Sequence, residues 1–371
     1  MTAPRDAVEE LTLLVLLAYP TIDGPLPKLG PLLVRGLREH GCSVDVAFWS
    51  RHRENESILD KVRGRLMDVV QIRRLMAGRE FDCVLITTTH DWPAIIRDIT
   101  LLVSMSRGCP HRILHFHGSL SDRLVRRDAW LLKLASHVLV GLASGLFVLS
   151  TEELHDWQAF SHHTPVWLVR NPYEPRAHAE RLSEVGASEV DVAYLFVGRL
   201  IAEKGVYELL EAFLRVTRRV PARLHIAGRG PCANEIARRV SALGLQTKVV
   251  MHGYLDDEAL SRLYARCDVL VLPSYREGFP MVYLEAMDHG LAIVTTAIRG
   301  ALDNLRPEEN ALLIPPRSVD ALESAMMRLA EDPGLRRRMS TNNLRKVADY
   351  APESVALDYL KAVRSLISGR A

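Results

Sequence analysis

The stretch CDVLVLPSYREGFPMVYLEAMDHGLAIVTT, residues 267–296, contains an apolar run, a loop with Gly and Pro, a helical pattern and a second apolar run. Both apolar runs are continuous rather than alternating, which is typical of strands in a parallel sheet covered on both faces. Glu277 lies just before the predicted helix, and Glu285 lies one or two turns inside it. The N-terminus of a helix attracts anions such as phosphate, and carboxylates accept hydrogen bonds from hydroxyl groups. Two carboxylates beside a helix N-terminus therefore predict a ligand that carries both phosphate and hydroxyl groups.

The same alternation of apolar runs and helical patterns extends along the rest of the chain. Strands that alternate with helices in this way form a parallel sheet with helices on both faces. The pattern breaks at 170–191, which holds two prolines and many charges but no apolar run. The predicted strands are 11–19, 43–49, 82–88, 112–117, 145–150, 166–170, 192–198, 222–228, 248–253, 267–274, 291–296 and 310–315.

Two domains are therefore expected, and a length of 371 residues favours the same number. Each is predicted to be α/β with a doubly wound parallel sheet, and the two are expected to face one another across a cleft. We assign 1–176 to an N-terminal domain, 177–190 to a linker and 191–351 to a C-terminal domain. The helical pattern within 352–371 is compatible with packing on either domain.

The composition is that of an ordinary globular protein, with 48% hydrophobic and 25% charged residues and a formal net charge of +2. This balance gives no general indication of nucleic-acid binding. The apolar run at 11–19 is too short for a membrane span and follows acidic residues, where a signal peptide needs basic ones. Five cysteines without a CxxC pair indicate reduced thiols. We expect a cytoplasmic protein.

Sequence motifs give little support for a bound metal or a resident cofactor. The sequence contains no HExxH, no DxD and no GxxxxGK[ST]. Gly228, Gly230 and Ala233 match a GxGxxA dinucleotide fingerprint, but no acidic residue follows about 20 positions later, as that fingerprint requires. We expect no metal and no resident cofactor, and the pattern argues against a nicotinamide dehydrogenase.

Two cations follow the first predicted strand of the second domain. Arg199 and Lys204 lie at its carboxyl end, around a turn into a helix. An arginine offers a forked donor and a lysine a point charge, and together they are suited to hold a diphosphate. The alternative is a solvated helix start.

In the first half, His117 ends a predicted strand and precedes Gly118. We expect His117 on the cleft side, with His115 deeper on the same face of the strand. A hydrogen-bonded core or rim histidine is the favoured alternative. The loop after the first strand contains Gly24, which either approaches a ligand phosphate or belongs to an ordinary turn.

Taken together, the segments FVGRLIAEKG, HIAGRGP, HGYL, CDVLVLPSYREGFPMVYLEAMDHGLAIVTT and RNP resemble the retaining nucleotide-sugar glycosyltransferases of the two-Rossmann GT-B fold, family 4. The resemblance is strong over about 190–335 and looser over 1–176. The spacing E-x7-E, formed by Glu277 and Glu285, is its most specific element. The family also ends in a helix that crosses back to the first domain, which assigns 352–371 to that domain.

The resemblance implies a role for each matching residue. Glu277 would approach the donor sugar and the reacting centre, and Glu285 would hold the ribose hydroxyls. Arg199 and Lys204 would bind the diphosphate and neutralise the leaving group, and His117 would lie near the donor sugar and acceptor. The further donor-binding positions are Gly24, Gly278, Phe279 and Pro280.

Two departures from the family pattern concern the donor site. Arg229 stands between the glycines of GxG, where an acidic residue is usual, and this shifts a charge near the donor. Gly24-Pro25 stands where the first loop often has two glycines.

The function implied is a retaining, hexosyltransferase-type enzyme that moves a sugar from a nucleoside-diphosphate sugar to a glycan or glycolipid in cell-surface polysaccharide synthesis. The donor is a substrate, and the family generally needs no divalent metal. The alternatives are a sugar-nucleotide epimerase on the same fold and a catalytically silent homologue that binds a sugar nucleotide.

Two segments of the first domain, 58–79 and 122–134, are basic and helical in pattern. The favoured interpretation is that each packs on the sheet and exposes a solvated basic face. The alternative is peripheral contact with anionic lipid. Nucleic acid is the third choice, because aromatic and basic residues do not alternate here.

Overall fold

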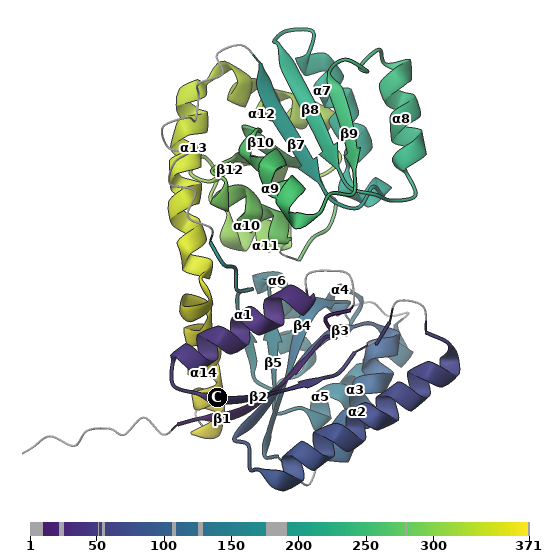
Figure 1. Ribbon diagram of the computed structural model, residues 1–371, viewed down its shortest axis with the longest axis vertical. Coiled ribbons are helices and arrows are strands. Elements are labelled where there is room, and N and C mark those ends of the chain that lie inside the picture. The colour runs from purple at the N-terminus through teal and green to yellow at the C-terminus, as the bar shows by residue number, and fades with distance from the viewer. Residues whose placement is uncertain are drawn as a thin grey trace, which may run out of the picture. The chain divides into compact units, whose positions relative to one another are not determined.

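The computed structural model describes residues 10–21, 26–50, 52–53, 56–105, 109–124, 129–175, 191–278 and 280–369 (Figure 1). The chain divides into two compact units, one comprising Met1–Glu174 with Tyr350–Ala371 and the other Pro175–Asp349. The predicted linker, 177–190, lies outside the described residues.

The described residues of the first unit form a six-stranded sheet in the order β2-β1-β3-β4-β5-β6, with every strand pair parallel. All six strands were predicted, although β4 continues two residues beyond the predicted end at His117. The strands are β1 (Thr12–Leu17), β2 (Ser43–Phe48), β3 (Cys83–His90), β4 (His111–Ser119), β5 (Gly145–Val148) and β6 (Val166–Leu168).

Helices cover both faces of this sheet. Side chains that alternate along each strand therefore enter two separate cores, one on each face. Leu14 and Leu16 of β1 belong to one core, and Leu13 and Val15 belong to the other. The helices of this unit are α1 (Leu26–Glu39), α2 (Ile58–Gly78), α3 (Trp92–Met105), α4 (Ser121–Leu124), α5 (Trp130–Leu142), α6 (Thr151–Phe160) and α14 (Pro352–Ile367).

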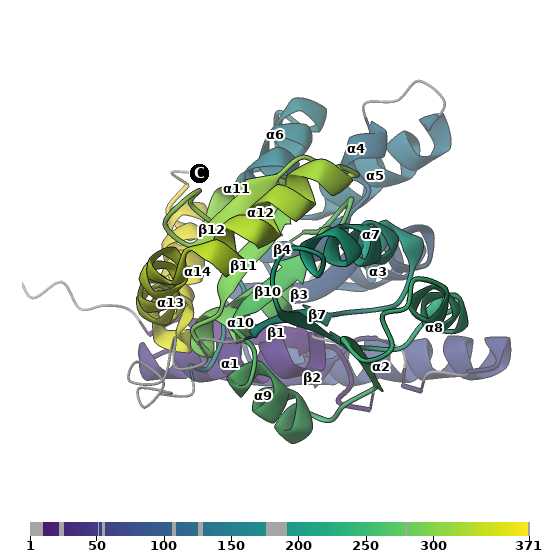
Figure 2. The ribbon, with the colours of Figure 1, turned by 90° about the horizontal axis from the view of Figure 1, so that it is seen from above.

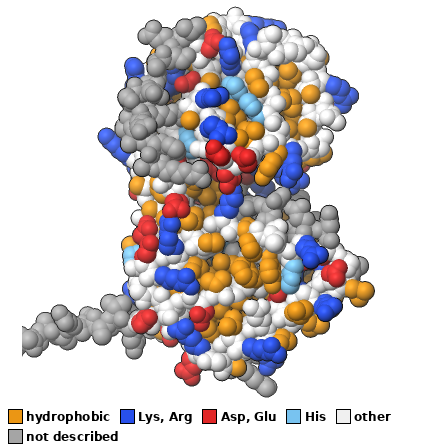
Figure 3. All heavy atoms as spheres, viewed as in Figure 1, with side chains coloured by type: hydrophobic (Ala, Val, Ile, Leu, Met, Phe, Trp, Pro, Cys, Tyr) orange, Lys and Arg blue, Asp and Glu red, His pale blue; other side chains and the backbone are white. Residues whose placement is uncertain are grey.

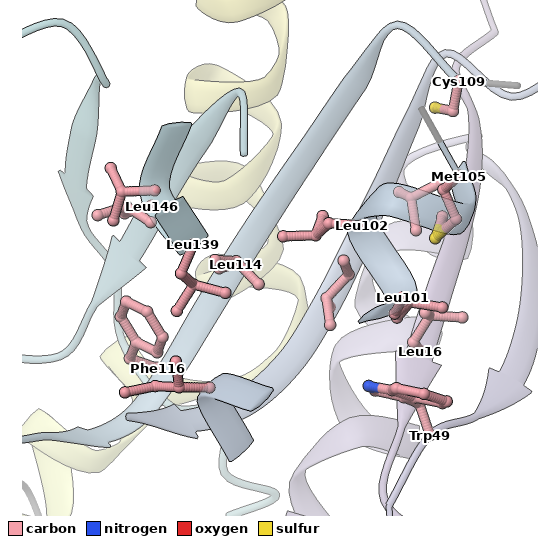
Figure 4. Packing of buried hydrophobic residues seen from close by; sticks show 14 of the residues in the cluster. Leu16, Trp49, Leu101, Leu102, Met105, Cys109, Leu114, Phe116, Leu139 and Leu146 are labelled. Atoms are coloured by element: carbon pink, nitrogen blue, oxygen red, sulfur yellow. The ribbon is translucent and has the colours of Figure 1, made fainter. Parts of the chain in front are cut away.

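The core that contains Leu16 is closed by helices α2, α3, α5 and α6. Leu101 and Leu102 of α3 and Leu139 of α5 point into it, as Figure 4 shows. Ser57 caps α2, because its hydroxyl accepts the backbone N–H of Asp60.

The opposite face of the sheet is covered by α1 and α14, which lie side by side in Figures 1 and 2. Their approach is close at Gly36, because a Cβ atom there would overlap the backbone carbonyl of Pro352. Tyr359 and Val355 of α14 are fully buried in this core. An ion pair of 2.7 Å between Arg170 Nη2 and Asp358 Oδ2 fixes the same helix.

The described residues of the second unit also form a six-stranded parallel sheet, in the order β12-β11-β10-β7-β8-β9. The sequence predicted each of these strands, because each is a short run of mainly apolar residues; β7, β10, β11 and β12 are almost entirely buried, whereas β9 is largely half-buried or exposed. The strands are β7 (Val192–Val197), β8 (Ala222–Ala227), β9 (Val249–Gly253), β10 (Val269–Leu272), β11 (Ala292–Thr296) and β12 (Ala311–Ile314).

Helices alternate with these strands along the second unit. Three of them begin at side-chain caps, with Asp256, Ser318 and Asp332 each accepting a backbone N–H of the first turn. The helices are η2 (Ala202–Lys204), α7 (Val206–Val216), α8 (Ala233–Ala242), α9 (Asp257–Ala265), α10 (Met281–Asp288), α11 (Arg299–Asn304), α12 (Val319–Glu331) and α13 (Pro333–Lys346), followed by η3 (Val347–Tyr350).

Candidate functional site

The strand order of the second unit defines where a ligand is expected. Strands β7 and β10 are neighbours, and the chain continues from β7 toward β8 and β9 on one side and from β10 toward β11 and β12 on the other. Connections that leave adjacent strands in opposite directions create a topological switch point, where α/β sheets bind ligands at the carboxyl ends of the strands. The predicted donor residues of this unit lie on the segments that follow these two strands.

An ion pair joins the two segments at this point. Lys204 Nζ contacts Glu277 Oε1, with the side chain of Lys204 22% exposed and that of Glu277 11% exposed. Both side chains are therefore mostly shielded from water, but a part of each remains exposed to solvent.

The turn between η2 and α7 places Lys204 beside Glu277. Gly205 has a φ of 68°, a left-handed conformation that glycine adopts readily. A Cβ atom at Gly205 would overlap the backbone carbonyl of Pro273, which follows β10. Close to this point, Tyr275 N donates a 2.8 Å hydrogen bond to the carbonyl of Glu203. Glycine at 205 thus lets the two segments pack together.

Helix α10 begins immediately after Pro280, as the sequence predicted. Pro280 provides no side-chain cap for it, so the first amides of α10 are suited to an anionic ligand. Gly278 and Pro280 lie in the loop before the helix, and Phe279 lies outside the described residues.

Glu285 is half-buried on the second turn of α10. Its Oε2 accepts a 2.8 Å hydrogen bond from the hydroxyl of Tyr264 on α9. Tyr264 therefore orients one carboxylate oxygen, while Glu277 is oriented by Lys204. The two glutamates of E-x7-E thus differ in their partners as well as in their positions.

Arg199 is exposed in the loop after β7. This loop packs against the one after β8, since Leu200 N donates a 3.0 Å hydrogen bond to the carbonyl of Arg229. A Cβ atom at Gly228 would overlap the carbonyl of Gly198, and one at Gly230 would overlap Leu200. Close packing of two loops therefore accounts for both glycines of the GxGxxA match.

Arg229, the residue that departs from the family pattern, lies over the ring of Tyr254. The guanidinium carbon is 4.6 Å from the ring centroid, a geometry for a cation–π contact. Both side chains are exposed. The positive charge at 229 therefore has an aromatic partner.

In the first unit, His117 projects from β4 and is half-buried. Burial lowers the pKa of His117 to about 3, so its imidazole is neutral at neutral pH. The pKa of His115 is also lowered, first by burial and then by the neighbouring His117. The expectation that His115 lies deeper on the same strand face is confirmed, because His115 is 3% exposed and its ring centroid is 4.0 Å from that of His117.

A chain of hydrogen bonds links His117 to the C-terminal helix. His117 Nε2 lies 3.1 Å from His115 Nδ1, and His115 Nε2 lies 3.3 Å from the hydroxyl of Tyr359. When Tyr359 donates its proton to the carbonyl of Arg170, 3.3 Å away, His115 donates to Tyr359 and His117 donates to His115. The Nδ1 of His117 is then an acceptor, suited to a hydroxyl. The opposite proton order turns the same atom into a donor.

A pocket of about 540 Å³ also lies in the first unit, between α1 and strands β1 and β2. Its wall is mainly apolar, with Arg35, Arg38 and Glu39 among the lining residues. None of the predicted site residues lines it. Gly24 lies outside the described residues.

Three further expectations concern metal, thiols and membrane. Across the described residues, no group of three or more His, Cys, Asp and Glu side chains is placed to hold a metal ion. All five cysteines are free thiols; four are buried and Cys232 is half-buried. In the described part of the chain, every helix is too short or too polar to cross a bilayer.

The chain resembles known glycosyltransferases in sequence. It is 31% identical over 173 residues to an uncharacterized glycosyltransferase of Methanocaldococcus jannaschii, which covers 46% of this chain and 44% of the relative. The chain thus spans less than half of the length of the curated relatives it first matches.

Solved structures match almost the whole chain. Sucrose-phosphate synthase from Thermosynechococcus elongatus superimposes with a TM-score of 0.73 and 19% identity, over 97% of this chain and 100% of that one. Anabaena HepE in complex with UDP superimposes with a TM-score of 0.68 and 16% identity, over 96% and 100%. At this identity the likeness shows the fold, which is GT-B, as predicted.

The family model for glycosyl transferases group 1 matches residues 180–346, which include β7 to β12 and both glutamates of E-x7-E. The geometry at the switch point of the second unit falls within this matched region. Over this region, which makes up most of the second unit, the chain is similar to the glycosyl transferases group 1.

Proposed function

We propose that the protein is a retaining glycosyltransferase that uses a nucleoside-diphosphate sugar. The observation that carries the proposal is the ion pair between Lys204 and Glu277 at the switch point of the second sheet. A cation and a carboxylate at this place match the two charges of the reaction, a leaving diphosphate and an electron-poor sugar ring.

Lys204 is the group proposed to stabilise the leaving diphosphate. When the bond between the sugar C1 and the phosphate oxygen breaks, the electron pair passes to the diphosphate. Negative charge therefore grows where a fixed cation is most effective. Arg199 is proposed as the second cation, with the first amides of α10 as further anion donors.

Glu277 and Glu285 are proposed to act on different parts of the donor. Glu277 would face the sugar ring, whose positive charge increases as the bond to the diphosphate breaks. The incoming acceptor hydroxyl forms the new bond to C1 and passes its proton to the leaving diphosphate. Glu285, whose carboxylate is oriented by Tyr264, would accept hydrogen bonds from the ribose hydroxyls. Gly278, Phe279 and Pro280 are proposed to form the loop against the donor, with Gly24 as a contact from the first unit.

The acceptor is proposed to be a hydroxyl of a glycan or glycolipid in cell-surface polysaccharide synthesis. His117 supports this choice, because a neutral imidazole binds a hydroxyl without adding charge. A lipid-linked acceptor would also require peripheral contact with a membrane.

A thermal-shift screen against nucleoside diphosphates and their sugars tests the donor site. A ligand at 100 times its Kd should stabilise the protein by about 2.7 kcal/mol. Lys204→Ala should reduce this stabilisation, whereas Lys346→Ala, which removes another ion-paired lysine, should leave it unchanged. No stabilisation by any nucleotide would contradict the proposal.

The reaction products separate the remaining alternatives. Transfer with the donor's anomeric configuration kept supports a retaining transferase. Conversion of the donor into its epimer would identify an epimerase, and binding without turnover on any acceptor would identify a silent homologue.

A further inference from the structure

Most of the large hydrophobic side chains that are strongly exposed belong to three helices of the first unit, α2, α3 and α5. Trp130 of α5 is 64% exposed, and Leu59 of α2 is 82% exposed. Contiguous exposed apolar area is uncommon on a soluble protein and marks a contact surface. The exposed residues are Leu59, Val62, Leu66, Met67, Val70, Trp92, Ile96, Val103, Trp130, Leu131, Leu134 and Val138.

These helices lie next to one another on the same face of the first sheet. Helix α3 packs against both α2 and α5, and Figures 1 and 2 place the three in a row. Ile72, Leu101 and Leu139 point inward to the core. The exposed residues recur at spacings of three and four, as at Trp130, Leu134 and Val138, and therefore occupy the outward faces.

On α2, several basic side chains are exposed, whereas one of the two acidic side chains is buried. Lys61, Arg63, Arg73 and Arg74 are exposed, whereas Asp68 is 2% exposed and accepts a 2.7 Å hydrogen bond from Tyr19. The exposed acid of α2 is Asp60, in the first turn. In Figure 3, hydrophobic and basic side chains alternate along the lower right of the first unit, where Figure 1 places α2. The outward face is thus both apolar and cationic.

We propose that the outward face of α2, α3 and α5 docks on an anionic membrane. Trp130, Leu131 and Leu134 would enter the boundary between headgroups and acyl chains, and Arg73 and Arg74 would meet lipid phosphate. Apolar residues combined with basic ones are the features by which helices bind the surface of an anionic bilayer. A purely apolar partner would leave the arginines without counter-charges. Apart from Gly24, the proposed donor residues lie in the other unit, and none is on α2, α3 or α5, so this proposal can hold or fail independently of the enzymatic one.

Vesicle co-sedimentation of the full chain tests the surface. Binding is expected to vesicles of phosphatidylglycerol mixed with phosphatidylcholine, and it should weaken in high salt and with pure phosphatidylcholine. Arg73→Ser with Arg74→Ser should lower the partition coefficient by about fivefold per cation. Leu131→Ser with Leu134→Ser should lower it by at least about tenfold, because the two side chains lose apolar burial.

Matched control variants keep the test specific. Arg337→Ser with Arg338→Ser changes another exposed arginine pair, and Leu302→Ser with Leu357→Ser changes two exposed leucines on other helices. Both controls should bind vesicles like the unmodified protein. The proposal is overturned if the unmodified chain ignores anionic vesicles, or if the controls lose as much binding as the test variants. It is also overturned if the protein is a dimer that the leucine variant dissociates, because a second copy then covers this face.

Discussion

The two sheets carry opposite chemistry near the carboxyl ends of their strands. In the second unit, the segments after β7 and β10 bring together the charged pair Lys204 and Glu277. In the first unit, β4 carries the neutral histidines His115 and His117, linked to a buried tyrosine. A charged pair suits a ligand on which charge develops, whereas a neutral chain of hydrogen bonds suits hydroxyl groups. Under the proposed function, the same type of sheet would support two kinds of recognition, and the side chains near the strand ends would decide which.

Removal of Lys204 should have the largest effect. Lys204→Ala should lower kcat about a hundredfold or more, because the leaving-group charge grows in the transition state. Affinity for nucleoside diphosphate should fall less than kcat. Steady-state kinetics with the donor varied, beside Lys346→Ala as a control, measures both. An unchanged kcat in this variant would show that Lys204 takes no part in the chemical step.

Neutralising Glu277 should have the second largest effect, and it separates the role of the side chain's charge from that of its shape. Glu277→Gln keeps the side-chain volume and some hydrogen bonding, but it cannot stabilise positive charge on the sugar ring. Turnover should fall while diphosphate affinity stays nearly normal. Product formation and diphosphate binding, measured on one preparation, give the answer. Near-normal turnover would mean a hydrogen-bonding role, and lost diphosphate affinity would mean a structural one.

Glu285 should affect binding rather than the chemical step. Glu285→Ala should raise the donor KM, by about tenfold for a lost charged hydrogen bond, and leave kcat largely intact. Tyr264→Phe, which removes the hydroxyl that holds Glu285, should give a smaller change in the same direction. Equal losses of kcat and kcat/KM in Glu285→Ala would show that the contact forms only in the transition state.

The first unit should respond to pH through its histidines. The pKa of His117 is about 3 in the folded protein and about 6.5 in an unfolded chain, so protons bind the unfolded state first. This group therefore leaves stability unchanged above about pH 6.5 and lowers it as pH falls from there toward 3. Thermal unfolding between pH 7 and 4 should show a shallower slope for His117→Gln than for the unmodified chain. The exposed His162→Asn should keep the original slope, and equal slopes for all three proteins would contradict the role of burial.

The strands were predictable because a buried parallel strand is a continuous apolar run, and Val192–Val197 and Val269–Leu272 are such runs. The contact between Glu277 and Lys204 could not be predicted, since the two residues are 73 positions apart in the sequence and only the strand order brings them together. The resemblance predicted both residues as parts of one site but not their contact. For Gly228 and Gly230, sequence alone cannot tell a phosphate loop from the packing of two loops.

The helical faces were harder to predict for another reason. Helix α2 carries Leu, Val and Met on more than one side, so its periodicity does not identify the side that meets the sheet. Ile72 is buried, whereas Leu66 and Met67 are exposed. The chain of hydrogen bonds from His117 to Tyr359 was likewise not expected, because 242 positions separate these residues in the sequence.

The return of α14 to the first unit has a consequence for biosynthesis. Six buried residues of α14 complete a core whose other buried members precede residue 170: Val355, Ala356, Tyr359, Leu360, Ala362 and Val363. A ribosome therefore translates the whole second unit before the first has all of its cover. The second unit is drawn from one continuous segment and can finish packing earlier, although its synthesis starts later. A nascent chain that stops before Pro352 would expose the apolar face between α1 and the sheet, and would present it to chaperones and proteases.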